Sequence, residues 1–100
     1  MTKSSRIILY TSDYCTHSWA VERFLEEHEI PVKLLNIDRN PKARKQVMKI
    51  NNGDASVPTL VFPDGTTLTE PSFGELRYKL GIQTPSLKDR ILGLFGRNSE

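Results

Sequence analysis

Residues 6–18 read RIILYTSDYCTHS, and they hold a strand, a turn and the start of a helix from which the fold can be worked outward. Residues 6–10 form a short apolar run rich in strand-favouring residues, which predicts a buried strand. Residues 11–13 are polar and typical of a turn. Apolar residues then recur at helical spacing, with charged residues on the other face; the apolar residues are Trp19, Val21, Phe24 and Leu25. This pattern predicts an amphipathic helix that begins near Cys15 and ends near His28.

Proline, glycine and capping residues set the boundaries of the elements that follow. Pro31 is expected to stop the first helix, because proline cannot continue one. Residues 32–37 predict a second strand, and Pro41 at the first helical position predicts a second helix that either Asp38 or Asn40 caps. The later predicted elements are a strand over 59–62, a turn at Asp64-Gly65, a strand over 66–69, a helix from Pro71-Ser72 through Leu80 that Gly81 ends, and an amphipathic segment from Leu87 to Phe95.

The predicted order is therefore β-α-β-α-β-β-α with a short C-terminal helix. The first β-α-β unit implies parallel strands with a right-handed crossover, and the Asp64-Gly65 turn implies an antiparallel hairpin. An α/β fold with a mixed four-stranded sheet and helices on both faces follows. We expect residues 1–83 to form one domain and residues 84–100 to be an amphipathic extension packed on or near it.

Composition narrows the class of protein. A chain of 100 residues has room for one core. Its formal net charge of +2 is too small to indicate nucleic acid as a partner. The chain has one cysteine, which excludes an intrachain disulfide. Its two histidines add too few ligands for a metal centre to be expected. No apolar run approaches a membrane span and no signal peptide is evident, so we expect a cytoplasmic protein whose thiol stays reduced.

Cys15 is the candidate nucleophile. Free amides and the positive end of the helix dipole meet at a helix start, and both favour a thiolate, which is the nucleophile of disulfide exchange. A lone cysteine is otherwise commonly buried and inert, so position alone leaves both interpretations open. His17 is either a proton donor to a leaving thiolate or an exposed histidine of the first turn. Ser18 lies about one turn from Cys15 and either donates its hydroxyl to the thiolate or is a substitution that traps one redox state.

The segment Ser56-Val57-Pro58-Thr59 is the second candidate feature. A Val–Pro bond directly before a strand can be cis. Because Pro58 has no N–H for the sheet, the backbone groups of Val57 remain free for an extended ligand. The alternative is a proline that only marks where the strand begins.

Together these motifs resemble the glutaredoxin family of the thioredoxin fold, over roughly residues 7–80. The resemblance rests on YTSDYCTHS at 10–18, SVPT at 56–59 and Asp64-Gly65, and it is closest to the mycoredoxin-like bacterial branch. It implies that Cys15 is the nucleophilic cysteine and that Val57 and Pro58 form the cis-proline pair that binds a thiol ligand. It also implies a wider set of ligand-binding residues: Tyr14, Thr16, Ser56, Glu70 and Ser72.

The resemblance predicts a monothiol thiol–disulfide oxidoreductase that reduces protein–small-thiol mixed disulfides. Its co-substrate would be a low-molecular-weight thiol, glutathione or a mycothiol-like thiol, with no tightly bound cofactor. Its partners would be that thiol and disulfide-bearing or S-thiolated proteins, with no nucleic acid and no membrane, and the chain would act as a monomer. Two alternatives stay open: a non-catalytic binding module, and a dimer that bridges an iron–sulfur cluster through Cys15.

Several positions depart from the family pattern. Ser18 stands where dithiol members have a resolving cysteine, so a dithiol cycle is impossible. Ser12 replaces a lysine often found three residues before the cysteine. Glu70-Pro71-Ser72 replaces the loop that typically takes the γ-glutamyl end of glutathione, and the Glu70 carboxylate would repel an anionic ligand there. The thiol that this chain uses is therefore left open.

Overall fold

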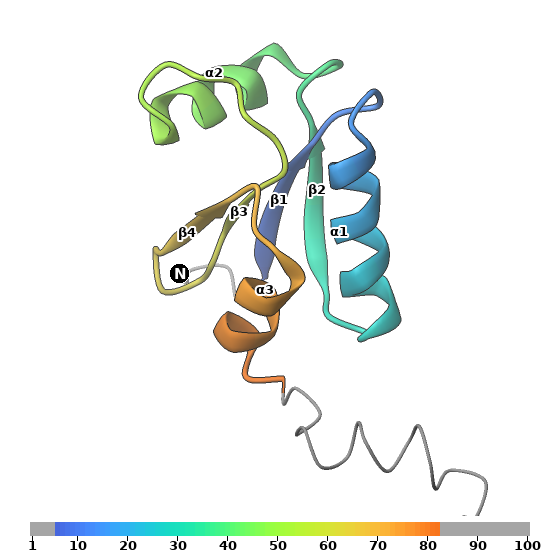
Figure 1. Cartoon of the computed structure of the whole chain (residues 1–100). Coiled ribbons are helices and arrows are strands. Elements are labelled where there is room, and N and C mark those ends of the chain that lie inside the picture. Colours follow the sequence, from blue (N-terminus) through green and yellow to red (C-terminus); the bar gives the residue numbers. More distant parts are fainter. Residues whose placement is uncertain (1–5, 83–100) are drawn as a thin grey trace, which may run out of the picture.

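The computed structural model describes residues 6–82, which form one mixed sheet flanked by helices (Figure 1). The elements in chain order are β1 (Ile7–Thr11), α1 (Thr16–Glu27), β2 (Val32–Asn36), α2 (Pro41–Ile50), β3 (Thr59–Val61), β4 (Thr67–Thr69) and α3 (Phe73–Leu80). The strand order across the sheet is β2-β1-β3-β4, with β1 parallel to β2 and β3 antiparallel to both of its neighbours. The predicted element order and mixed four-stranded sheet are confirmed, and the segment predicted over residues 84–100 lies outside the described residues.

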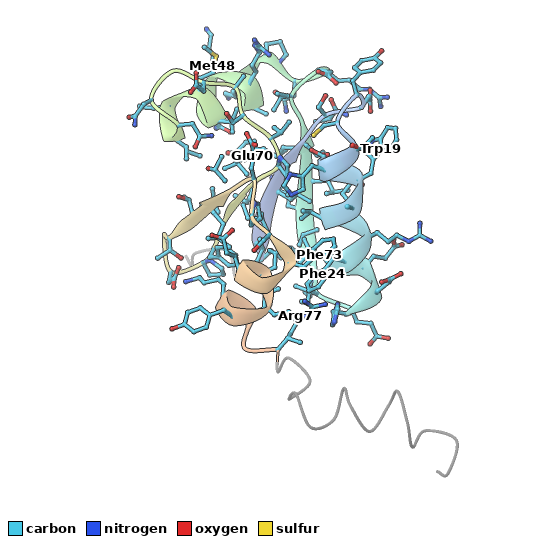
Figure 2. The ribbon with its side chains drawn as sticks, viewed as in Figure 1. Trp19, Phe24, Met48, Glu70, Phe73 and Arg77 are labelled. Carbon is cyan, nitrogen blue, oxygen red and sulfur yellow. The ribbon has the colours of Figure 1, made fainter. Side chains whose placement is uncertain are left out.

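Different helices cover the two faces of the sheet, because side chains alternate along each strand. Beneath α1 and α3 lies the larger core, which contains Ile7, Leu9, Val21, Phe24, Leu25, Leu60, Phe62 and Leu76. Beneath α2 lies a smaller one, which contains Tyr10, Ile37, Ala43 and Val47. The two helices on the larger core touch each other, since the ring of Phe24 on α1 stacks on Phe73 of α3 with centroids 5.2 Å apart (Figure 2).

One apolar residue of α1 does not join this core. Trp19 was grouped by its spacing with Val21, Phe24 and Leu25, but it is 52% exposed and projects from the helix (Figure 2). The buried stripe of α1 is instead completed by Ser18, which is fully buried. A polar residue therefore takes the interior position nearest to Cys15.

The ends of α1 and α2 show which residues set these two boundaries. Helix α1 ends at Glu27, four residues before Pro31, so the proline is not what ends it. The helix ends because Glu29 adopts a left-handed φ of 55° and the Ile30 N–H donates to the Leu25 carbonyl at 2.9 Å. Helix α2 is capped by Asn40, whose side chain accepts from the Ala43 N–H at 3.0 Å. The alternative cap, Asp38, is engaged elsewhere.

The β3–β4 hairpin is tied to α3 through its turn. Gly65 has a φ of 89°, which suits glycine, and the Asp64 carboxylate accepts from the Thr66 hydroxyl and N–H at 2.6 and 2.9 Å. Lys79 of α3 reaches the same carboxylate at 2.9 Å. These contacts, led by the Thr66 hydroxyl, hold the pKa of Asp64 well below its usual range.

Candidate active site

Cys15 caps the N-terminus of α1 with its sulfur. Its backbone is extended, with φ −121° and ψ 110°, and its Sγ accepts a hydrogen bond from the Ser18 N–H at 3.4 Å. The side chain is half-buried, so the sulfur remains reachable from solvent. A backbone N–H and the positive end of the helix dipole both point at the sulfur, and each favours negative charge on it.

The loop before β3 brings a second element to the sulfur. The Val57–Pro58 peptide bond is cis, and the Cys15 thiol donates to the Val57 carbonyl with Sγ and O 3.6 Å apart. Within residues 6–82 the Val57 N–H has no hydrogen-bond acceptor. Beside it, the Pro58 carbonyl accepts from the Glu70 N–H at 2.7 Å. An N–H and a carbonyl that can bind an extended chain therefore lie next to the thiol.

Ser18 contacts Cys15 in a different way from the one expected. One of the two sequence-based interpretations had the Ser18 hydroxyl donate to the sulfur, but the backbone N–H makes this contact. The hydroxyl oxygen is fully buried and has no hydrogen-bond partner within the described part of the chain. The reason is geometric: at the third residue of a helix the N–H points back toward the cap, while this side chain points into the core.

His17 is hydrogen-bonded to the segment before α3. Its Nε2 donates to the Pro71 carbonyl at 2.9 Å, and the ring is half-buried. The sequence did not reveal this contact. His17 joins the first turn of α1 to the connection that carries Glu70 and Ser72.

The start of α3 is already occupied by a carboxylate from within the chain. The Ser72 hydroxyl accepts from the Glu75 N–H at 3.0 Å, and the Glu75 carboxylate accepts from the Ser72 N–H at 2.8 Å. This capping box uses the hydroxyl that the sequence offered to a ligand. Glu70 is exposed, with φ 49°, and it adds a second carboxylate before the same helix (Figure 2).

A hydrogen-bond network that the sequence did not reveal holds the loop before Cys15. Asp38 Oδ2 accepts from the Ser12 hydroxyl at 2.7 Å and from the Asp13 N–H at 2.9 Å. The Asp13 carboxylate in turn accepts from Arg39 at 2.8 Å and from the Asn36 side chain at 2.9 Å. The two bonds that Asp38 accepts, that from the Ser12 hydroxyl first and that from the Asp13 N–H second, lower the pKa of Asp38. The available signal was topology, because the loops after two parallel neighbouring strands lie at one sheet edge.

The remaining predicted residues lie on or beside this surface. Tyr14 is 87% exposed and Thr16 is exposed, so both are open to a ligand or partner. Ser56 is half-buried, and its carbonyl accepts from the Thr59 hydroxyl at 2.8 Å. Among residues 6–82 there is no group of three potential metal ligands. None of the described helices is long and apolar enough to cross a membrane.

Comparisons with known proteins point to one family. A family model described as Glutaredoxin matches residues 7–66. A Mycobacterium tuberculosis protein whose name places it among the glutaredoxins is 32% identical over 77 residues, which cover 77% of this chain and 92% of that protein. Mycoredoxin 1 of Corynebacterium glutamicum is 29% identical over 76 residues, which cover 76% and 94% of the two chains.

Solved structures show the same fold. The glutaredoxin from Methanosarcina mazei Go1 matches with a TM-score of 0.66 and 19% identity, over 81% of this chain and 84% of that one. The thioredoxin-like protein BC3987 matches with a TM-score of 0.65 and 22% identity, over 73% and 97% of the two chains. The predicted thioredoxin-like fold and the mycoredoxin-like resemblance are thereby confirmed.

Proposed function

This chain belongs to the glutaredoxin family, and from that membership we propose that it reduces mixed disulfides between proteins and a small thiol through Cys15 alone. The family and the fold support a thiol–disulfide oxidoreductase role. One observation carries the finer proposal: the Cys15 sulfur caps α1, accepts the Ser18 N–H at 3.4 Å and lies 3.6 Å from the Val57 carbonyl. A nucleophile and a backbone ligand site thus lie side by side.

The reaction proceeds in two exchanges that need no second cysteine, and the chain has only one. In the first, the Cys15 thiolate attacks the small-thiol sulfur of a mixed disulfide. A bond forms between those two sulfurs, the old disulfide bond breaks, and the protein substrate leaves as a thiolate that takes up a proton. In the second, a thiolate of another small thiol attacks the small-thiol sulfur bound to Cys15. The small-thiol disulfide leaves with both oxidising equivalents, and the Cys15 thiolate is regenerated.

Val57 is proposed to serve the bound small thiol. In the reduced protein its carbonyl accepts from the Cys15 thiol. Once the sulfur is in a mixed disulfide it has no proton to donate, so this carbonyl can accept an N–H of the ligand while the Val57 N–H donates to a ligand carbonyl. Tyr14, Thr16, Ser56 and Pro58 are proposed to line the groove around this pairing.

The charge at the start of α3 bears on which thiol is used. The Glu75 carboxylate already occupies the Ser72 N–H, and Glu70 adds a second negative charge nearby. A ligand carboxylate placed there would be repelled by both at close range. We therefore propose a mycothiol-like thiol in preference to glutathione, with Glu70 acting in selection against anionic ligands.

The setting of the reaction is part of the same proposal. The protein acts in the cytoplasm, where its lone thiol stays reduced, and it acts as a monomer, since each exchange uses a single cysteine. Its partners are the small thiol and S-thiolated proteins, and it needs no tightly bound cofactor.

Intact-mass spectrometry tests the proposal. The protein is incubated with oxidised glutathione and, separately, with mycothiol disulfide, and then with the matching reduced thiol; Cys15→Ser is the control. We expect one adduct on Cys15, formed faster with the mycothiol disulfide and released by the reduced thiol. If neither disulfide forms an adduct although iodoacetamide alkylates Cys15, the chain is a binding module instead. Visible absorbance of anaerobically prepared protein would indicate the iron–sulfur alternative.

A further inference from the structure

A cluster of three polar side chains lies directly behind the loop that carries Val57. Thr59, the first residue of β3, is fully buried, and it pairs across the sheet with Thr69 of β4. Asn51, the C-cap of α2, completes the cluster and is half-buried. None of the three is hydrogen-bonded to Cys15, and the two-step reaction gives them no role; Thr59 ends the SVPT motif but is not among the residues proposed to bind the ligand.

Every polar side-chain atom of the cluster has a hydrogen-bond partner. The Thr59 hydroxyl donates to the Ser56 carbonyl at 2.8 Å, and it accepts from the Asn51 side-chain amide at 3.1 Å. The Thr69 hydroxyl donates to Asn51 Oδ1 at 2.7 Å. The two threonine hydroxyls lie 3.4 Å apart, a longer contact than the bond to Ser56, so the Thr59 proton is directed at the loop.

The consequence concerns the backbone on either side of Val57. The Ser56 carbonyl before it is held by Thr59, and the Pro58 carbonyl after it is held by the Glu70 N–H at 2.7 Å. The Ser56 carbonyl and the Val57 N–H belong to one planar peptide group, so holding that carbonyl fixes the direction of the N–H. The Val57 carbonyl belongs to the next peptide group, which lies between the two held carbonyls. Thr59 holds one of the two anchors with a side chain, so a substitution can remove that anchor while leaving the backbone groups of the loop in place.

We propose that Thr59 is a positioning residue for the small-thiol site, and that Asn51 and Thr69 hold its hydroxyl in the required direction. The inference rests on the proposed function, because it concerns the site where Val57 pairs with the bound thiol. Without the Thr59 hydroxyl, the Ser56 carbonyl loses its partner and the Val57 groups lose their alignment. Small misplacements of a binding group lower the efficiency of catalysis steeply.

The test compares steady-state reduction of a peptide–mycothiol mixed disulfide by wild type, Thr59→Val and Thr59→Ser. Valine keeps the branched shape without the hydroxyl, and serine keeps the hydroxyl. We expect Thr59→Val to raise KM about tenfold with kcat within about twofold, and Thr59→Ser to restore KM. Alkylation of Cys15 by iodoacetamide should be unchanged in both variants, because that reagent does not need the loop.

Two further variants keep the inference refutable if Thr59→Val folds poorly. Asn51→Ala removes the bond that directs the Thr59 hydroxyl from a half-buried position, and it should raise KM in the same direction by a smaller factor. Thr66→Val is the matched control, since it removes a hydroxyl bonded to Asp64 in the β3–β4 turn, and its KM should equal that of wild type.

The outcomes separate this inference from the proposed function. A wild-type protein that fails to reduce the mixed disulfide overturns the proposed function, and with it the site to which the positioning role belongs. An active wild type whose KM is unchanged by both Thr59→Val and Asn51→Ala overturns only the positioning role. An equal rise of KM in Thr66→Val also overturns it, because the effect would then follow from general loss of stability.

Discussion

Replacing Ser18 with Ala should make the protein more stable, although the residue lies beside the active-site cysteine. Its hydroxyl is fully buried without a hydrogen-bond partner in the described part of the chain, and such a group destabilises a fold by about 1–3 kcal/mol. The helix propensity of alanine is also more favourable than that of serine, by a few tenths of a kcal/mol. The small void left by the missing oxygen lowers stability by a few tenths of a kcal/mol, which offsets the gain in helix propensity. We expect a net gain of about 1–2 kcal/mol in the free energy of unfolding.

The gain is large enough to measure. A change of 1 kcal/mol shifts the melting temperature of a domain of this size by about 4–8 °C, so a thermal melt and a urea titration followed by circular dichroism will both detect it. Thr16→Ala is the matched control, because it removes an exposed hydroxyl from the same helical turn. Its free energy of unfolding should stay within about 0.5 kcal/mol of wild type.

The same variant decides what Ser18 does for the reaction. Alanine keeps the backbone N–H that reaches the Cys15 sulfur at 3.4 Å, so the rate of mixed-disulfide reduction should stay within about twofold of wild type. A loss of stability of 1 kcal/mol or more would refute the reasoning, because the hydroxyl must then be satisfied. A tenfold slower reaction in a stable variant would show that the hydroxyl acts on the sulfur, as the sequence alone suggested.

Three other substitutions test the remaining parts of the site and fold. Cys15→Ser should abolish thiol exchange without unfolding the protein, since an alcohol is a far weaker nucleophile; exchange near the wild-type rate, followed by mass spectrometry, would contradict the proposed function. Ser18→Cys should form a disulfide with Cys15 on oxidation, and two free thiols in the oxidised protein would show that the side chains cannot meet. Asp64→Asn should lower the melting temperature by more at pH 7 than at pH 2. Because the folded-state pKa of Asp64 is lowered, its stabilising contribution is present above the usual carboxyl pKa of about 4 and is lost as the pH falls; an equal deficit at both pH values would contradict this.

Much of the fold could be predicted because its signals are local. The apolar run at 6–10, the capping pattern at Asn40 and Pro41 and the turn at Asp64-Gly65 each specify an element within a few residues. The end of α1 near His28 was predicted, but the residue that causes it was not, since Glu29 takes the left-handed conformation in which glycine is usual. The exposure of Trp19 was not predicted, because helical spacing does not show whether Trp19 or its neighbour Ser18 completes the buried face of α1.

The position of Cys15 at a helix start was determined by the sequence itself, because strand, turn and helix signals stand next to one another in residues 6–18. The surroundings of its sulfur were decided only by tertiary structure. Val57 lies 42 positions from Cys15 along the chain, and Pro71, whose carbonyl accepts from His17, lies 54 positions from His17. A hydrogen bond depends on distance and direction within a few tenths of an ångström, and only the packing of strands and helices brings such distant groups within that range.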